Sequence, residues 1–202
     1  MKSLFVLMLC IPITLNAQLD SAKLVKEIRT FQQELNKEYK DKYESPLKQA
    51  DLRKFEHHDF YPINIDYVVV AELTPTSNSK FIPMTATGAI VREYRTYAIA
   101  SFQLQGQAYS LPIYQSKSLM STPEYEDYLF LPFTDLTTGD ESYGGGRYLD
   151  LRIPKEGTTL IINFNLAYNP YCAYNEKYSC PLVPKTNDLP VAIRAGVKLS
   201  AK

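Results

Sequence analysis

The pattern of apolar and polar positions changes once along the chain, from a helical period to an extended one. Apolar side chains recur at spacings of four, three, four and four, with Lys, Glu and Gln between them, at Leu24, Ile28, Phe31, Leu35 and Tyr39. This spacing predicts an amphipathic helix at about 20–44 whose apolar stripe docks on the rest of the protein. Asp20 or Ser21 is suited to cap its start, and the Ser-Pro step that follows residue 44 ends it.

From about residue 66 onward the pattern is that of short strands. Gln105-Gly106 predicts the tight turn of a hairpin, and no helical segments alternate with the strands. One helix followed by strands predicts a mainly β fold, a single-domain antiparallel β sandwich or open barrel with an N-terminal amphipathic helix. The expected strands are 67–73, 87–94, 97–103, 107–114, 128–133, 148–153, 159–165 and 190–197.

The N-terminal residues 1–17 are typical of a cleaved signal peptide. Lys2 precedes an apolar run that is too short to span a bilayer, and the run leads to the small residue Ala17. A lipoprotein modified at Cys10 is the alternative, which Leu9 disfavours because a small residue is expected before a lipidated cysteine. The sequence therefore predicts an exported protein, periplasmic or secreted, with one domain at 18–202.

The charge distribution and the absence of known motifs exclude several classes of function. The 22 basic and 22 acidic residues are interspersed, so the chain has no basic stripe for nucleic acid. No later apolar run reaches membrane-spanning length. The chain lacks a Gly-x-Ser-x-Gly motif, a Walker loop and a paired-histidine zinc motif, so no cofactor or metal is expected.

Two cysteines remain after removal of the leader, Cys172 and Cys180. An oxidising compartment favours a disulfide between them, which would stabilise the fold by about 2.5 kcal/mol at most because it closes a short loop. Free thiols and a metal site are the alternatives. His57 and His58 are the only histidines, and as neighbours on a strand they would point to opposite faces, which disfavours a shared metal ion.

Three consecutive glycines precede Arg147. Gly144–Gly146 is interpreted as a turn where two backbones pack closely, and the alternative is an anion-binding loop. We expect Arg147 to pair with Asp150 first and Glu141 second, because an unpaired buried guanidinium is costly. A nearby acidic stretch is interpreted as a polar turn rather than a calcium loop; it contains Asp135, Thr137, Asp140 and Glu141.

A cluster of Asn and Tyr residues follows. Asn163 and Asn165 share one face of a predicted strand, and Tyr168 and Asn169 lie on the loop that leaves it. Amides and phenol rings suit a small-molecule pocket, whereas the alternative is that the asparagines satisfy backbone groups. We expect the Gly144–Arg147 turn to lie beside this segment. The ligand-binding candidates are Tyr143, Arg147, Asp150, Asn163, Asn165, Tyr168 and Asn169.

Several motifs together resemble a known family. They are YGGGRYLDL at 143–151, NFNLAYNPYCAY at 163–174, CPL at 180–182, IRAG at 193–196, YESPL at 43–47, FYPIN at 60–64 and YLFLPFTD at 128–135. In their order along the chain these motifs resemble the uncharacterised DUF1684 family, a domain of unknown function, over nearly all of the mature chain. The resemblance implies no activity.

Two function hypotheses remain. The first is an exported β-rich module that binds a small polar ligand at the Tyr/Asn-rich segment. The alternative is a small hydrolase or transferase that uses Cys172 as nucleophile or a water activated by His57 or His58.

Overall fold

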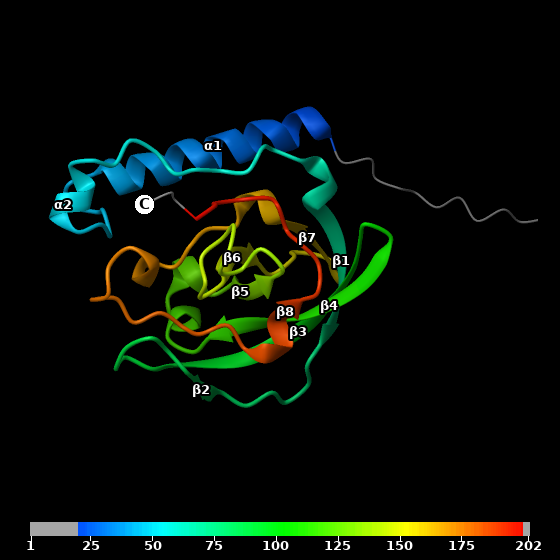
Figure 1. The fold of residues 1–202 in the computed structure, drawn as a ribbon. Helices are drawn as coiled ribbons and strands as arrows, with labels where there is room; N and C mark the ends of the chain where they lie inside the picture. The colour runs from blue at the N-terminus through cyan, green and yellow to red at the C-terminus, as the bar shows by residue number, and fades with distance from the viewer. Residues whose placement is uncertain (1–19, 200–202) are drawn as a thin grey trace, which may run out of the picture.

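The structure, a computed structural model, describes residues 20–199. The expected signal peptide at 1–17, with Cys10 in it, lies outside the described residues. The fold is mainly β, with an antiparallel sheet curled into a half-barrel and one long N-terminal helix, which confirms the expected fold class (Figure 1). The helices are α1 (Ser21–Lys40) and α2 (Gln49–Leu52), and the strands are β1 (Val68–Pro75), β2 (Ile82–Met84), β3 (Arg92–Leu104), β4 (Gln107–Ser116), β5 (Tyr128–Asp135), β6 (Arg147–Arg152), β7 (Thr159–Asn163) and β8 (Asp188–Leu189).

Within the described residues the strands follow the order β6-β5-β4-β3-β1-β7, with β2 added on β3 and β8 parallel to β5. The predicted hairpin is confirmed as β3 and β4, whose turn holds Gln105 at φ 51° and Gly106 at φ 76°. Two positive φ angles are those of the tight turn that matches the natural strand twist. The long hairpin therefore forms the middle of the curled sheet.

The sheet has two buried faces, because alternate residues of a strand point to opposite sides. The inner face carries the main core, to which β5 contributes Leu129, Leu131 and Phe133, and β6 contributes Leu149. The outer face carries a second, aromatic cluster of Met84, Tyr94, Tyr114, Phe130, Tyr148 and Cys180. Successive residues of β6 therefore belong to different environments.

Helix α1 begins as expected, with the Asp20 side chain accepting from Ala22 N at 3.0 Å. The two ends of its apolar stripe are buried, with Ile28 at 0% and Tyr39 at 1% exposure. The middle of the stripe, Phe31 and Leu35, is only half-buried. Docked ends and an uncovered middle leave room beneath the helix. Within residues 20–199, no helix is long and apolar enough to cross a membrane.

The helix ends at Lys40 rather than near residue 44. Asp41 is already extended, and its Oδ1 accepts from Tyr43 N at 2.7 Å and Glu44 N at 3.1 Å. A side chain that captures the amides ahead of it offers the backbone an alternative to the helix. The helix therefore stops four residues early.

The strand expected at 87–94 begins only at Arg92. Residues just before it bond to a different segment, since Thr87 N donates to Cys180 O at 2.9 Å and Leu182 N donates to Thr85 O at 2.7 Å. The segment at 190–197 does not form the expected strand either. Its carbonyl groups at alternate residues face a buried arginine side chain instead of a neighbouring strand, as described below.

Candidate functional site

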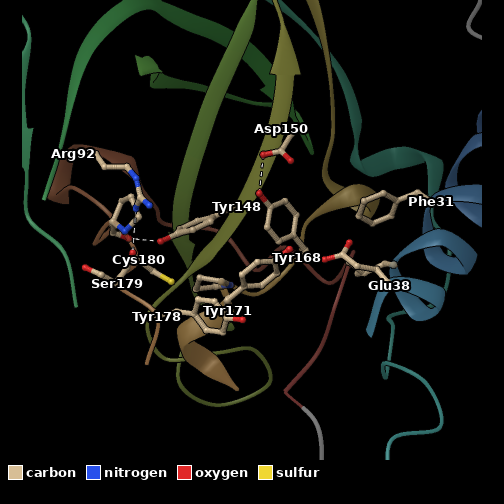
Figure 2. Close-up of a pocket in the computed structure, with 13 residues that line it drawn as sticks. Phe31, Glu38, Arg92, Tyr148, Asp150, Tyr168, Tyr171, Tyr178, Ser179 and Cys180 are labelled. Carbon is tan, nitrogen blue, oxygen red and sulfur yellow. Dashed lines mark hydrogen bonds between the residues drawn. The ribbon is translucent and has the colours of Figure 1, made fainter. Parts of the chain in front are cut away.

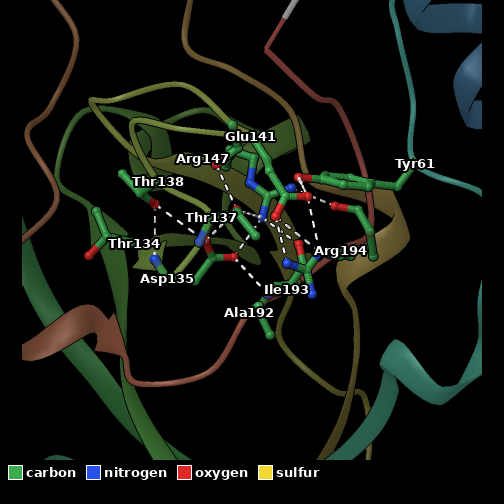
Figure 3. Close-up of polar contacts among 12 residues, drawn as sticks. Tyr61, Thr134, Asp135, Thr137, Thr138, Glu141, Arg147, Ala192, Ile193 and Arg194 are labelled. Atoms are coloured by element: carbon green, nitrogen blue, oxygen red, sulfur yellow. Dashed lines mark hydrogen bonds and ion pairs between the residues drawn. The ribbon is translucent and has the colours of Figure 1, made fainter.

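Arg147 starts β6 and points into the inner face, where its side chain is 1% exposed. Its Nη2 donates to Asp135 Oδ2 at 2.7 Å (Figure 3). The expected pairing with Asp150 or Glu141 is therefore wrong. Strand register explains the difference: Phe133 opposes Arg147, so Asp135 lies two residues further along β5 and on the same face.

The guanidinium also holds the C-terminal segment. Nη1 donates to Ala195 O at 2.5 Å, and Nη2 donates to Ile193 O at 2.8 Å. Asp135 completes the network by accepting from Ile193 N at 3.1 Å and Thr137 N at 2.8 Å. Burial lowers the pKa of Arg147, and the Asp135 charge opposes that shift. We call this closed arrangement the ion-pair network; its contacts hold the protein together rather than reach toward solvent.

The glycine turn supports the same packing. Gly146 has φ +84°, and a Cβ there would lie 2.7 Å from Phe133 O. The close backbone approach agrees with the interpretation as a turn. Glu141, the second expected partner of Arg147, instead pairs with Arg194, whose Nη2 donates to its Oε1 at 2.6 Å (Figure 3).

The three asparagines serve the backbone. Asn163 Oδ1 accepts from Asn165 N at 3.1 Å, and Asn165 Nδ2 donates to Asn64 O at 2.8 Å while its Oδ1 accepts from Asn64 N at 2.9 Å. Asn169 Nδ2 donates to the backbone oxygen of Lys198 at 3.3 Å and to Tyr174 Oη at 3.1 Å. Asn163 and Asn165 are thus scaffold residues that tie the end of β7 to the segment before β1.

Cys172 and Cys180 are free thiols in this structure, so the expected disulfide is not formed. The Cys172 amide donates to Cys180 Sγ at 3.2 Å, and the Tyr143 hydroxyl lies 4.0 Å from Cys172 Sγ. Burial raises the pKa of Cys180 to about 12, which keeps that thiol protonated and unreactive. Burial also raises the pKa of Tyr143 to about 12.

His58 is 2% exposed and packs edge-on against Tyr39, with ring centroids 4.3 Å apart. Burial lowers its pKa to about 4. His57 is exposed. Neither ring hydrogen-bonds to a cysteine anywhere in residues 20–199. The alternative hypothesis of a thiol nucleophile with a histidine base therefore lacks its geometric pair.

The Gly144–Arg147 turn lies beside the segment that carries the Asn and Tyr cluster, as expected. Tyr148 directly follows the glycine turn, and its amide donates to Tyr168 O at 2.9 Å while Tyr168 N donates back at 3.1 Å. This bridge places Tyr168 beside β6 on the outer face. From there its hydroxyl donates to Asp150 Oδ1 at 2.7 Å.

A cavity of about 390 Å³ opens beside this bridge, between α1 and the outer face (Figure 2). We call it the tyrosine pocket, after Tyr148, Tyr168, Tyr171 and Tyr178 in its wall. Phe31 and Leu35 line the helix side, which explains why the middle of the helical stripe is uncovered. Its charged side chains are Glu38, Arg92 and Asp150.

Two of the expected ligand-binding residues, Tyr168 and Asp150, line this pocket. Tyr143, Arg147 and the three asparagines do not. Sequence reasoning missed Phe31, Leu35, Glu38 and Arg92. The helical pattern predicted that Phe31 and Leu35 are buried, but only as core residues. Nothing in the sequence around Glu38 and Arg92 distinguishes them from the other charged residues, so only the tertiary structure could assign them to the pocket.

Comparison with known proteins places the chain in a family. A profile described as "Protein of unknown function (DUF1684)" matches residues 53–198. The chain belongs to this DUF1684 family. No curated protein matches the chain.

A solved structure has a similar fold. The chain is similar to the solution NMR structure of the uncharacterized protein from gene locus rrnAC0354 of Haloarcula marismortui. The TM-score is 0.69 and the identity 29%, with 89% of this chain and 96% of that chain covered. The family model establishes the family and the solved structure supports the fold, and neither names a ligand or a reaction.

Proposed function

We propose that this DUF1684 protein is an exported module that binds a small molecule in the tyrosine pocket. The observation that carries the proposal is the cavity itself, about 390 Å³ beneath a helix whose apolar stripe is left half-covered at Phe31 and Leu35. A cavity of this size with aromatic walls and a few polar groups is typical of ligand sites. A contiguous exposed apolar patch with polar groups at its rim is typical of a ligand-binding groove.

Fragment screening by ligand-observed NMR tests the proposal. Leu35→Trp should block the cavity, so fragments that bind the natural protein should no longer bind this variant. The matched control is Arg29→Trp, which adds the same bulk at an exposed position of α1 that does not line the cavity. Equal binding by all three proteins, or no fragment binding to the natural protein, would overturn the proposal.

Export is part of the proposal and is supported by the leader-like residues 1–17. The Cys172 backbone amide lies 3.2 Å from Cys180 Sγ, and in an oxidising compartment the two neighbouring thiols would form a disulfide. The intact mass of the protein recovered from cells, measured with and without reduction and alkylation, shows whether the leader has been cleaved and whether Cys172 and Cys180 are oxidised. A retained leader or two alkylated thiols without prior reduction would contradict this part.

The geometry favours binding over the enzymatic alternative. Cys180 lines the pocket with a thiol that burial keeps protonated, and Cys172 has no histidine partner among the described residues. The pocket's side chains instead contact one another through phenol and carboxylate groups.

A further inference from the structure

Three of the four tyrosine hydroxyl groups in the tyrosine pocket donate their hydrogen bonds to protein groups. Tyr168 donates a hydrogen bond to Asp150 Oδ1 at 2.7 Å, and Tyr171 donates one to Glu38 Oε1 at 2.5 Å. Tyr148 donates to Pro181 O. Each hydroxyl has only one proton but two lone pairs, so these three groups have acceptor capacity left and no proton to offer a ligand.

The protons stay on these hydroxyls. Burial, and after it the Asp150 charge, raises the pKa of Tyr168 far above its ordinary value. Burial and the hydrogen bond to Glu38 raise the pKa of Tyr171 in the same direction. The phenols therefore stay protonated and remain hydrogen-bond donors to the carboxylates.

The two carboxylates add further acceptors. Asp150 Oδ1 takes hydrogen bonds from both Tyr168 and Tyr128, each at 2.7 Å, whereas its Oδ2 accepts none from residues 20–199. Glu38 Oε1 takes the Tyr171 hydroxyl, and its Oε2 likewise accepts none within the described chain. Neither carboxylate has an ion-pair partner there. The pocket wall therefore carries two negative side chains, each with a carboxylate oxygen that no described protein group uses.

Arg92 makes the two sides of the pocket differ in charge. It lies at the opposite side from Glu38 (Figure 2), where its Nη1 donates to Ser179 O at 3.3 Å. A second positive charge on a ligand would therefore meet repulsion at the far end. Between the two ends lie aromatic rings and the apolar side chains of Phe31 and Leu35.

We infer that the tyrosine pocket, if it binds small molecules as proposed above, selects an organic ammonium ion that carries one positive charge and an apolar body. The ammonium donates a hydrogen bond to one free carboxylate oxygen, Asp150 Oδ2 or Glu38 Oε2, and the charge of the other carboxylate attracts it from further away. The tyrosine rings add cation–π interactions. The apolar body lies against Phe31 and Leu35.

Three ligands of similar size but different charge test this inference. Phenethylamine should bind about tenfold more tightly than phenethyl alcohol, and phenylacetate should bind most weakly. Isothermal titration measures all three. Equal binding of the amine and the alcohol overturns charge selection, and so does tighter binding of phenylacetate. Pocket-dependent fragments that bind while the amine does not would overturn the inference and leave the binding function standing.

Two isosteric variants locate the charge. Asp150→Asn and Glu38→Gln each keep a carbonyl oxygen for their tyrosine partners, and each should weaken phenethylamine binding about tenfold with little change for phenethyl alcohol. Glu34→Gln is the matched control, since Glu34 is an exposed residue of α1 outside the pocket. Unchanged amine affinity in both pocket variants would overturn the assignment. Because Glu38 and Asp150 lie on different elements, misfolding of one variant leaves the other informative.

Discussion

Arg147 and Asp150 lie three residues apart on β6, and their side chains leave opposite faces of the sheet. On the inner face, the Arg147 guanidinium donates hydrogen bonds to Asp135 and to backbone carbonyls of the C-terminal segment. On the outer face, Asp150 uses one oxygen for two tyrosines and leaves the other without a partner from residues 20–199.

The difference lies in access to water. A fully buried charge must find every partner inside the protein, because each missing hydrogen bond costs several kcal/mol. A carboxylate at the wall of an open pocket has no such requirement, and it can leave an acceptor for a ligand. We therefore assign stability to the ion-pair network and binding to the tyrosine pocket, and three measurements of stability test that division.

The largest effect is expected from breaking the ion-pair network. Asp135→Asn should lower the free energy of unfolding by about 3–5 kcal/mol, because it leaves the Arg147 charge buried without its counterion. Urea denaturation measures the change. Glu141→Gln is the control: it breaks the partly exposed pair with Arg194 and should cost at most about 1 kcal/mol. Equal effects from the two variants would show that burial does not distinguish these pairs.

A second effect concerns His58, whose ring packs against Tyr39 and Phe55 under the end of α1, away from open water. Burial, and to a lesser degree the His57 charge, lowers the pKa of His58 from 6.5 to about 4. Between pH 6.5 and about 4, His58 is protonated in the unfolded chain but neutral in the native protein. Its contribution to the free energy of unfolding is therefore complete above pH 6.5 and is lost as the pH falls toward 4. The expected loss is about 3 kcal/mol.

Urea denaturation across this pH range measures the effect. His58→Phe should remove most of the slope between pH 6.5 and 4, since the ring it replaces packs against Tyr39 and Phe55. His57→Gln should keep most of the slope because burial of His58, the larger cause, is unchanged. A slope that survives in His58→Phe would assign the pH dependence to the carboxylates.

The smallest effect is expected in the pocket. Leu35→Ala should lower stability by about 1 kcal/mol, because Leu35 is half-buried and faces the cavity. Ile28→Ala, at a fully buried position of the same stripe, should cost about 2–5 kcal/mol. Urea denaturation of both variants compares them directly. A Leu35→Ala cost as large as that of Ile28→Ala would mean that the pocket region is packed core.

Local patterns predicted most of the fold. The hairpin at Gln105-Gly106 and the cap at Asp20 depend on a few adjacent residues, and both are confirmed. The strand expected at 190–197 failed for a non-local reason. Its alternating residues are suited to a strand, but Arg147 and Asp135 take the backbone groups that would have paired with a neighbour.

The candidate site shows the same division. Tyr168 could be named from the Asn/Tyr cluster, and Asp150 only as an expected partner of Arg147. Asn163 and Asn165 were equally conspicuous and proved to bond the backbone. A residue type states which hydrogen bonds a side chain can make. It does not state whether protein groups have already used them.

The sequence by itself determined the family, the mainly β class, the amphipathic helix and the central hairpin, because periodicity and turn chemistry are properties of neighbouring residues. Only the tertiary structure decided that Arg147 pairs with Asp135 and that Glu38 on α1 meets Tyr171 across the pocket. Those partners lie 12 and 133 residues apart, and strand register and helix docking, which depend on the whole core, bring them together.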